Sequence, residues 1–239
     1  MTIEELLERS SIKHRRMKHR LQIVSTLFLF VLCLCYGCSK EEEYYYPSVK
    51  LEFLTATTNQ KGIIQEVIAD NGKVYHVQND GSNLKLPADT LLRIVTNYEE
   101  VEGGVKLYGA AVPISNIPIP KAEFNEEMVH DPASIQSIWM GRDYLNMILQ
   151  VKAQNKKHTF HFIEQEATLN EAGDELFVHI IMYHNANEDI QAYTQRAYAS
   201  IPLKHYAAYG CKKVLLRFSP YTDYEGVASY DFEYLPNIK

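Results

Sequence analysis

The sequence predicts an all-β protein. Short segments in which apolar and polar residues alternate recur along the chain, and Gly, Pro and Asn separate them, a pattern typical of strands joined by turns. Tyrosine is also unusually abundant, with 17 Tyr against 9 Phe and 1 Trp. It suits half-buried strands because its ring packs while its hydroxyl reaches water. With 239 residues the chain is long enough for one large or two small domains.

The segment that begins at residue 48 is predicted to form five short strands. Its first strand alternates apolar and charged side chains, the period expected when one face is buried. Asn71-Gly72 separates the second strand from the third and indicates a hairpin, because both central residues of a two-residue turn must adopt positive φ. Gly103-Gly104 joins the last two strands in a second hairpin. Five strands of this length suggest a small barrel. The predicted strands are residues 49–53, 62–68, 74–77, 91–98 and 105–112.

Three prolines then interrupt the pattern. Pro113, Pro118 and Pro120 cannot donate hydrogen bonds to a strand ladder, so they predict an inter-domain connector. This divides the folded part into one domain over residues 48–120 and a second over residues 121–239.

Strands resume in the second domain and predict an antiparallel β-sandwich, since they are short, regularly spaced and accompanied by little helix. The clearest one places Leu145, Met147, Leu149 and Val151 on a single face. A helical turn is predicted at residues 202–209, because a proline opens it and Gly210 follows it. The predicted strands are residues 136–140, 144–151, 158–164, 176–183, 197–202, 214–219 and 230–234.

Residues 1–37 are predicted to be a signal peptide. The apolar stretch at residues 21–34 is shorter than the roughly 20 residues that cross a bilayer, but it fits the central region of a signal peptide and follows basic residues. Cys38 ends a segment that resembles a lipobox, at which the thiol is lipidated and the chain is cut before the cysteine. The usual Leu and small residue are replaced by Cys35 and Tyr36. We therefore expect a protein anchored to the outer membrane through Cys38.

Met17 is an alternative start of translation. Residues 1–16 are acidic and prone to form helix, unlike the start of a signal peptide, whereas Met17 opens a signal peptide of ordinary proportions. The hypothesis is that translation begins at Met17.

The charge of the chain argues against nucleic acid as a partner. The formal net charge is −6, and without residues 1–37 the chain carries 18 Lys or Arg against 27 Asp or Glu, a net charge of −9. A domain this acidic is repelled by phosphates, and no basic stripe interleaved with aromatic residues compensates. The folded part holds a single cysteine, Cys211, which is expected to be a buried small side chain rather than part of a disulfide or metal site.

No catalytic residues and no cofactor are predicted. The chain lacks the nucleophile elbow, the zinc-protease motif, the phosphate-binding glycine loop and the dinucleotide fingerprint, so we do not expect an enzyme. His158 and His161 are three residues apart on a predicted strand and therefore point to opposite faces. Together with His179 and His184 they are interpreted as strand-surface histidines, with no metal site.

Four segments resemble a known family. They are LLRI at residues 91–94, LYG at 107–109, SIWMGRDYLN at 137–146 and HTFHF at 158–162. With the lipoprotein cysteine, they resemble the NigD-like lipoproteins of Bacteroidetes over essentially the whole mature chain. The resemblance implies an N-terminal OB-like small barrel followed by a C-terminal β-sandwich. The family takes its name from a bacteriocin locus in which the member is an immunity or accessory factor, and it brings no catalytic or binding residues.

The tether at residues 38–47 bears on localisation. A run of charges followed by Pro47 is typical of a solvated linker. Lys40 followed by three Glu also resembles the export signal of surface lipoproteins in Bacteroidetes. We expect display at the cell surface, with the periplasmic face of the outer membrane as the alternative.

Two functions are consistent with the sequence. The resemblance favours a non-enzymatic interaction protein with a protein partner, and the acidic chain could engage a basic toxin through complementary charge. The alternative is a glycan-binding accessory lipoprotein of a nutrient-uptake system. Trp139, Tyr144 and Tyr183 could stack on a sugar, and the first two are the candidate ligand contacts. The apolar neighbours of Trp139 favour a place in the core instead.

Overall fold

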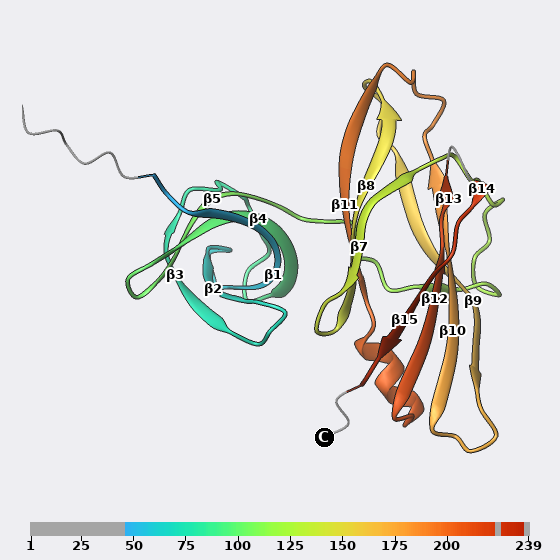
Figure 1. The fold of residues 1–239 in the computed structure, drawn as a ribbon. Helices are drawn as coiled ribbons and strands as arrows, with labels where there is room; N and C mark the ends of the chain where they lie inside the picture. The colour runs from blue at the N-terminus through green and yellow to red at the C-terminus, as the bar shows by residue number, and fades with distance from the viewer. Residues whose placement is uncertain (1–45, 223–225, 237–239) are drawn as a thin grey trace, which may run out of the picture. The chain divides into compact units, whose positions relative to one another are not determined.

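A computed structural model of the chain describes residues 46–222 and 226–236, and those from Ser48 onward belong to one compact unit. The predicted signal peptide, the alternative start Met17, the lipidation site Cys38 and the tether up to residue 45 lie outside the described residues. The all-β prediction is confirmed, since a closed barrel is followed by a sandwich of sheets (Figure 1). In the described ranges, no helical segment is long and apolar enough for a membrane span.

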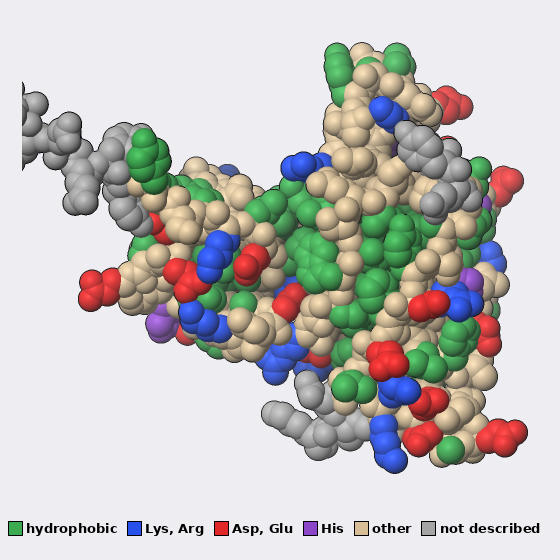
Figure 2. Space-filling view, viewed as in Figure 1, with side chains coloured by type: hydrophobic (Ala, Val, Ile, Leu, Met, Phe, Trp, Pro, Cys, Tyr) green, Lys and Arg blue, Asp and Glu red, His purple; other side chains and the backbone are tan. Residues whose placement is uncertain are grey.

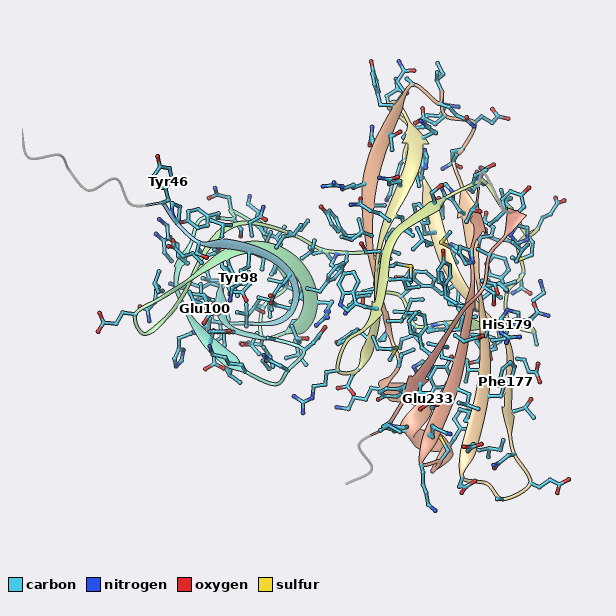
Figure 3. The ribbon with its side chains drawn as sticks, viewed as in Figure 1. Tyr46, Tyr98, Glu100, Phe177, His179 and Glu233 are labelled. Atoms are coloured by element: carbon cyan, nitrogen blue, oxygen red, sulfur yellow. The ribbon has the colours of Figure 1, made fainter. Side chains whose placement is uncertain are left out.

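The first five strands form an OB-like barrel. They close in the order β1-β2-β3-β5-β4, with β1 pairing antiparallel to β4 and β3 pairing parallel to β5. Figure 3 shows Tyr98 inside the ring of strands, where its hydroxyl donates a hydrogen bond to Glu52 Oε2 at 3.0 Å. Leu54, Ile94 and Leu107 pack with it. The strands are β1 Val49–Thr58, β2 Ile64–Ile68, β3 Val74–Asp80, β4 Leu91–Val101 and β5 Gly104–Ala111.

Both predicted hairpins of the barrel are confirmed, but the turn between β2 and β3 is of a different kind. Only Gly72 has positive φ, at 86°, so the expectation of positive φ at Asn71 is wrong. Ala69 N–H donates to Lys73 O at 2.9 Å and Gly72 N–H to Ala69 O at 2.8 Å, which gives a three-residue loop. Asn71 Oδ1 accepts the Lys73 N–H at 2.9 Å and supports this loop. The loop carries Asp70 out from the barrel.

The sandwich has a five-stranded sheet in the order β15-β12-β10-β9-β6 and a three-stranded sheet in the order β11-β8-β7, with a small β13-β14 pair. The pairs β10–β12 and β6–β9 are parallel, a departure from a purely antiparallel arrangement. The strands are β6 Ile119–Pro120, β7 Ser134–Met140, β8 Tyr144–Ala153, β9 Thr159–Leu169, β10 Glu175–Asn185, β11 Tyr193–Pro202, β12 Lys213–Ser219, β13 Tyr221–Thr222, β14 Gly226–Val227 and β15 Tyr230–Tyr234.

The core of the sandwich draws on both large sheets. The predicted apolar face of β8 is confirmed, because its four residues are buried. Cys211 is buried against the same core, as expected. The buried side chains include Leu145, Met147, Leu149, Val151, Phe162, Ile180, Leu216 and Phe218.

The proline-containing segment after β5 is hydrogen-bonded to the sandwich. Ile114 N–H donates to Tyr198 O at 2.8 Å, and Ser200 N–H donates to Ile114 O at 2.9 Å. Further along, Ile119 pairs with Ile163 of β9. The prolines therefore limit pairing to short stretches without freeing the segment from the sheets.

The predicted helical turn is a 3-10 helix, η1, at Lys204–Tyr209. Gly210 ends it with φ 70° and donates its N–H to Ala207 O at 3.1 Å. Tyr206 is buried, and its hydroxyl donates to Glu164 Oε2 on β9 at 2.8 Å. This bond joins η1 to the five-stranded sheet.

Candidate functional site

Trp139, a predicted ligand contact, lies where the barrel meets the sandwich. Its ring is edge-on to Phe53 of β1, with centroids 5.5 Å apart and planes inclined by 72°. The residue is 37% exposed, so its interpretation as a core residue is wrong. Ile138 and Met140 on either side pack against the sandwich core, and strand alternation turns Trp139 to the opposite face.

Tyr144, the second predicted contact, begins β8 and is half-buried. Its ring lies against the guanidinium of Arg93, with 4.2 Å between the guanidinium carbon and the ring centroid. Tyr183 is buried, and its ring is edge-on to Phe124 at 5.4 Å. Of the three aromatic residues considered for stacking on a ligand, Trp139 is the most exposed.

Arg93 of β4 is the centre of the junction, and it is only 3% exposed. Its Nη2 donates to Asp70 Oδ2 at 2.7 Å and to Asn146 Oδ1 at 3.0 Å. Its Nε donates to Ser200 Oγ at 3.1 Å, and Nη1 to Thr55 Oγ1 at 3.3 Å. A guanidinium has five N–H donors in a fixed plane, which suits a site with acceptors on several elements. One side chain of the barrel therefore bonds β8 and β11 of the sandwich.

Asp70 is held by the same network. Its Oδ2 accepts from Arg93 and also from Asn146 Nδ2 at 2.9 Å. Gly141 lies directly against these groups, because a Cβ there would clash with the Asp70 carboxylate and the Asn146 amide. A glycine at this position lets the hairpin loop of the barrel approach the sandwich. The Asp70 side chain remains 25% exposed.

Two of the four segments that carry the family resemblance meet at this junction. Arg93 comes from the first segment, while Trp139, Gly141 and Asn146 come from the longest one. Neither Arg93 nor Asp70 was predicted from the sequence as a site residue. The available signal was an arginine inside an apolar strand, since a buried charge has to be paired.

Two cavities, each of about 250 Å³, lie beside Asp70. One contains Trp139 in its wall, together with Phe53 and Asn71. The other contains Tyr144. Both of the predicted aromatic contacts therefore line cavities that share the same carboxylate.

The predicted strand-surface histidines have other surroundings. His184 is only 1% exposed, so the surface interpretation is wrong for it. Its Nδ1 is 2.9 Å from Asp131 O, and its Nε2 is 2.9 Å from His158 Nδ1. His161 instead packs on Tyr183, with ring centroids 5.4 Å apart. In the described part of the chain, no three metal-ligating side chains gather in a way that could hold an ion.

His184 and His158 together connect the loop at Asp131 to the residue that precedes β9. Burial lowers the pKa of His184, and the hydrogen bond to Asp131 only partly opposes this shift. Burial by itself raises the pKa of Asp189, but backbone N–H groups such as those of Gln154 and Asn155 outweigh it and lower the pKa to about 2. Asp189 Oδ2 lies 3.5 Å from His158 Nε2. These contacts indicate that His158 and His184 stabilise the fold.

Charged side chains of both signs are interspersed on the face that Figure 2 presents. On the barrel, Glu100 accepts from Lys50 at 2.5 Å and from Lys73 at 2.8 Å. These two hydrogen bonds lower the pKa of Glu100 to about 2. Exposed pairs of this kind add little to stability but neutralise charge locally.

Comparison with known proteins agrees with this architecture. The sequence model of the NigD-like C-terminal beta sandwich domain matches residues 116–234. The crystal structure of a NigD-like immunity protein from Bacteroides caccae ATCC 43185 is similar to this chain, with 34% identity and a TM-score of 0.67. That match covers 81% of this chain and 100% of the other.

A second solved structure shows the same fold. It is a protein of unknown function from Bacteroides vulgatus ATCC 8482, with 18% identity and a TM-score of 0.59, and the match covers 80% of this chain and 92% of the other. Among curated proteins, none is significantly similar. The match to the family domain and the likeness to the Bacteroides caccae protein show that the chain belongs to the NigD-like family.

Proposed function

We propose that this protein is a non-enzymatic lipoprotein that acts by binding another protein, in an immunity or accessory role. The observation that carries the proposal is the 34% identity to a solved NigD-like immunity protein over the full length of that chain. The network at the junction supports binding rather than catalysis, because Arg93, Asp70 and Asn146 hydrogen-bond to one another. Such a hydrogen-bond network makes the surrounding surface rigid.

The proposed location is the outer face of the outer membrane. The lipobox-like segment before Cys38 supports a lipid anchor there, and Lys40 with the three following Glu supports export to the surface. The periplasmic face is the alternative.

The proposed partner is a basic protein, such as a toxin against which the lipoprotein protects. The chain from Cys38 onward carries a net charge of −9. Complementary charge accelerates encounter, and this effect weakens as salt screens it.

The experiment is a pull-down from native envelopes, with the Cys38→Ala protein as soluble bait. We expect a protein partner at low ionic strength and much less of it in 1 M salt, where the Debye length falls to about 3 Å. Mass spectrometry identifies the partner. Recovery of no protein at either salt concentration contradicts the proposal.

The same preparation tests the anchor. The wild-type protein should enter the detergent phase on phase separation, whereas Cys38→Ala should stay in the aqueous phase or accumulate as precursor, because a diacyl chain dominates membrane affinity. Equal partitioning of the two proteins contradicts lipidation at Cys38.

A further inference from the structure

The cavity beside Trp139 combines an aromatic wall with polar groups that are already fixed in place. Its volume is about 250 Å³. Sites for drug-sized ligands are larger, at roughly 300–1,000 Å³. The size therefore suits a ligand of a single ring. Its lining consists of Leu51, Glu52, Phe53, Ala69, Asp70, Asn71 and Trp139.

The three polar side chains of the lining are each held through one atom. Asp70 accepts two hydrogen bonds at Oδ2, Asn71 accepts the Lys73 N–H at Oδ1, and Glu52 accepts the Tyr98 hydroxyl at Oε2. In the described part of the chain, no partner is found for Asp70 Oδ1, Asn71 Nδ2 or Glu52 Oε1. The cavity thus offers carboxylate acceptors and an amide donor whose positions are set before any ligand arrives, which lowers the entropic cost of binding.

Trp139 supplies the apolar wall. Its ring rests edge-on against Phe53, which fixes its orientation, and 37% of the residue is exposed. The indole N–H has no acceptor among the described residues. An aromatic face next to hydrogen-bonding groups matches a ligand that is apolar on its faces and polar around its rim.

The local charge argues for a neutral ligand. The Asp70 carboxylate is paired with Arg93 at 2.7 Å. Arg142 also lies near the turn, because its Nη1 would be 3.6 Å from a Cβ placed on Gly72, next to Asn71. Glu52 is the second carboxylate of the lining, so the two acids of the cavity have two guanidinium groups in the surrounding residues. A cationic side chain would therefore gain little net electrostatic attraction, because the nearby guanidinium groups offset the carboxylates.

We infer that this cavity binds one pyranose ring of a neutral saccharide, which stacks on Trp139 and hydrogen-bonds through its hydroxyls to Asp70 and Asn71. Each sugar hydroxyl both donates and accepts, so a fixed acceptor beside a fixed donor matches two adjacent hydroxyls. This activity is additional to the proposed protein binding and does not depend on it.

The single tryptophan of the chain makes the test direct, because all tryptophan emission comes from Trp139. The full chain with Cys38→Ala is titrated with glucose, galactose, mannose, xylose and N-acetylglucosamine, and with oligosaccharides of each. At least one series should change the emission saturably, and calorimetry should give the same Kd. A flat response in both measurements to every saccharide overturns the proposal.

Asn71→Asp is the decisive variant. It keeps the oxygen that accepts the Lys73 N–H, so the hairpin loop is preserved, while the amide donor is replaced by a charged carboxylate oxygen that cannot donate. Loss of one ligand hydrogen bond, about 1.4 kcal/mol, should weaken saccharide binding about tenfold. Tyr193→Ala removes an exposed aromatic ring that does not line the cavity and should leave binding unchanged. Circular dichroism checks that each variant is folded.

A basic side chain from a protein partner is the competing occupant. Arginine methyl ester and choline are the probes for it, and Asn71→Asp should tighten their binding because it adds a negative charge. Binding of these cations that Asn71→Asp strengthens, without any saccharide response, overturns the inference. Trp139→Ala should abolish saccharide binding, while the pull-down with the parent bait reports on the proposed function separately.

Discussion

At the scale of single residues, Arg93 shows how a charge can be kept inside a β protein. It stands in an apolar strand and is almost fully buried, yet four side chains accept its N–H groups and Tyr144 covers its plane. Burial of an unpaired guanidinium would be very unfavourable, so the acceptors have to be supplied by elements distant in sequence. The arginine therefore specifies which loops and strands meet.

Arg93→Lys should be markedly destabilising even though it keeps the charge. A lysine ammonium is a compact group and cannot reach acceptors spread around a planar fork, so several buried acceptors lose their donor. We expect the free energy of unfolding to fall by about 2–3 kcal/mol, within the range for buried polar groups left without partners. Urea unfolding followed by circular dichroism measures it.

Lys50→Arg provides the matched control for that substitution. Lys50 is an exposed barrel residue paired with Glu100, and the exchange should have no measurable effect. Equal stability of Arg93→Lys and the wild-type protein would show that the network contributes nothing.

The buried histidine pair predicts a dependence of stability on pH. Burial lowers the pKa of His184 in the folded protein below its ordinary value of 6.5, and His179 and His205 shift in the same direction. The unfolded chain therefore binds more protons as the pH falls below about 6.5, and the free energy of unfolding decreases there. Urea midpoints between pH 7.5 and pH 5.5 measure this.

His184→Gln should flatten part of that profile, because glutamine does not titrate while its amide can still donate and accept. The remaining slope belongs to His179 and His205. A slope identical to that of the wild-type protein would rule out His184 as a source of the acid sensitivity.

At the scale of elements, alternation and turn residues predicted the strands well and the details of pairing less well. The face of β8 and both barrel hairpins followed from side-chain period and from glycine. The turn at Asn71 differed because the asparagine side chain supports the loop by accepting a backbone N–H, which removes the need for two residues with positive φ. The parallel pairing of β10 with β12 could not be predicted, because the residues of a strand do not indicate whether its neighbour runs parallel or antiparallel.

The end of η1 gives an element-scale prediction. Gly210 has φ 70°, and a Cβ there would meet no atom within 4 Å. Gly210→Ala should therefore cost only the conformational penalty of a left-handed residue, about 1–2 kcal/mol. Gly210→Asn should cost less, because asparagine tolerates this region better. Thermal unfolding of the two variants measures the difference, and equal melting temperatures for Gly210→Ala and wild type would contradict the assignment.

At the scale of the whole molecule, the sequence predicted the barrel and the sandwich but not how their side chains meet. The ability of aromatic rings to stack on a sugar pointed to Trp139 and Tyr144 as ligand contacts, and both line cavities. The sequence did not reveal that Asp70 links those cavities, because Asp70 lies on a turn whose sequence is already explained by the hairpin. Trp139 was assigned to the core because its neighbours are apolar. On the edge strand β7 those neighbours show that one face is buried, but they do not show on which face Trp139 lies.

The network around Arg93 also determines the order in which the chain can complete its fold. Arg93 is 107 residues from Ser200 and 53 residues from Asn146. Contacts of such sequence separation form late, after the intervening loops have closed. A nascent barrel can supply Thr55 and Asp70 to the guanidinium, but the arginine gains Asn146 and Ser200 as acceptors only once β8 and β11 are in place. The stability of the barrel is thus coupled to that of the sandwich, and the two hydrophobic cores should fold and unfold as one cooperative unit.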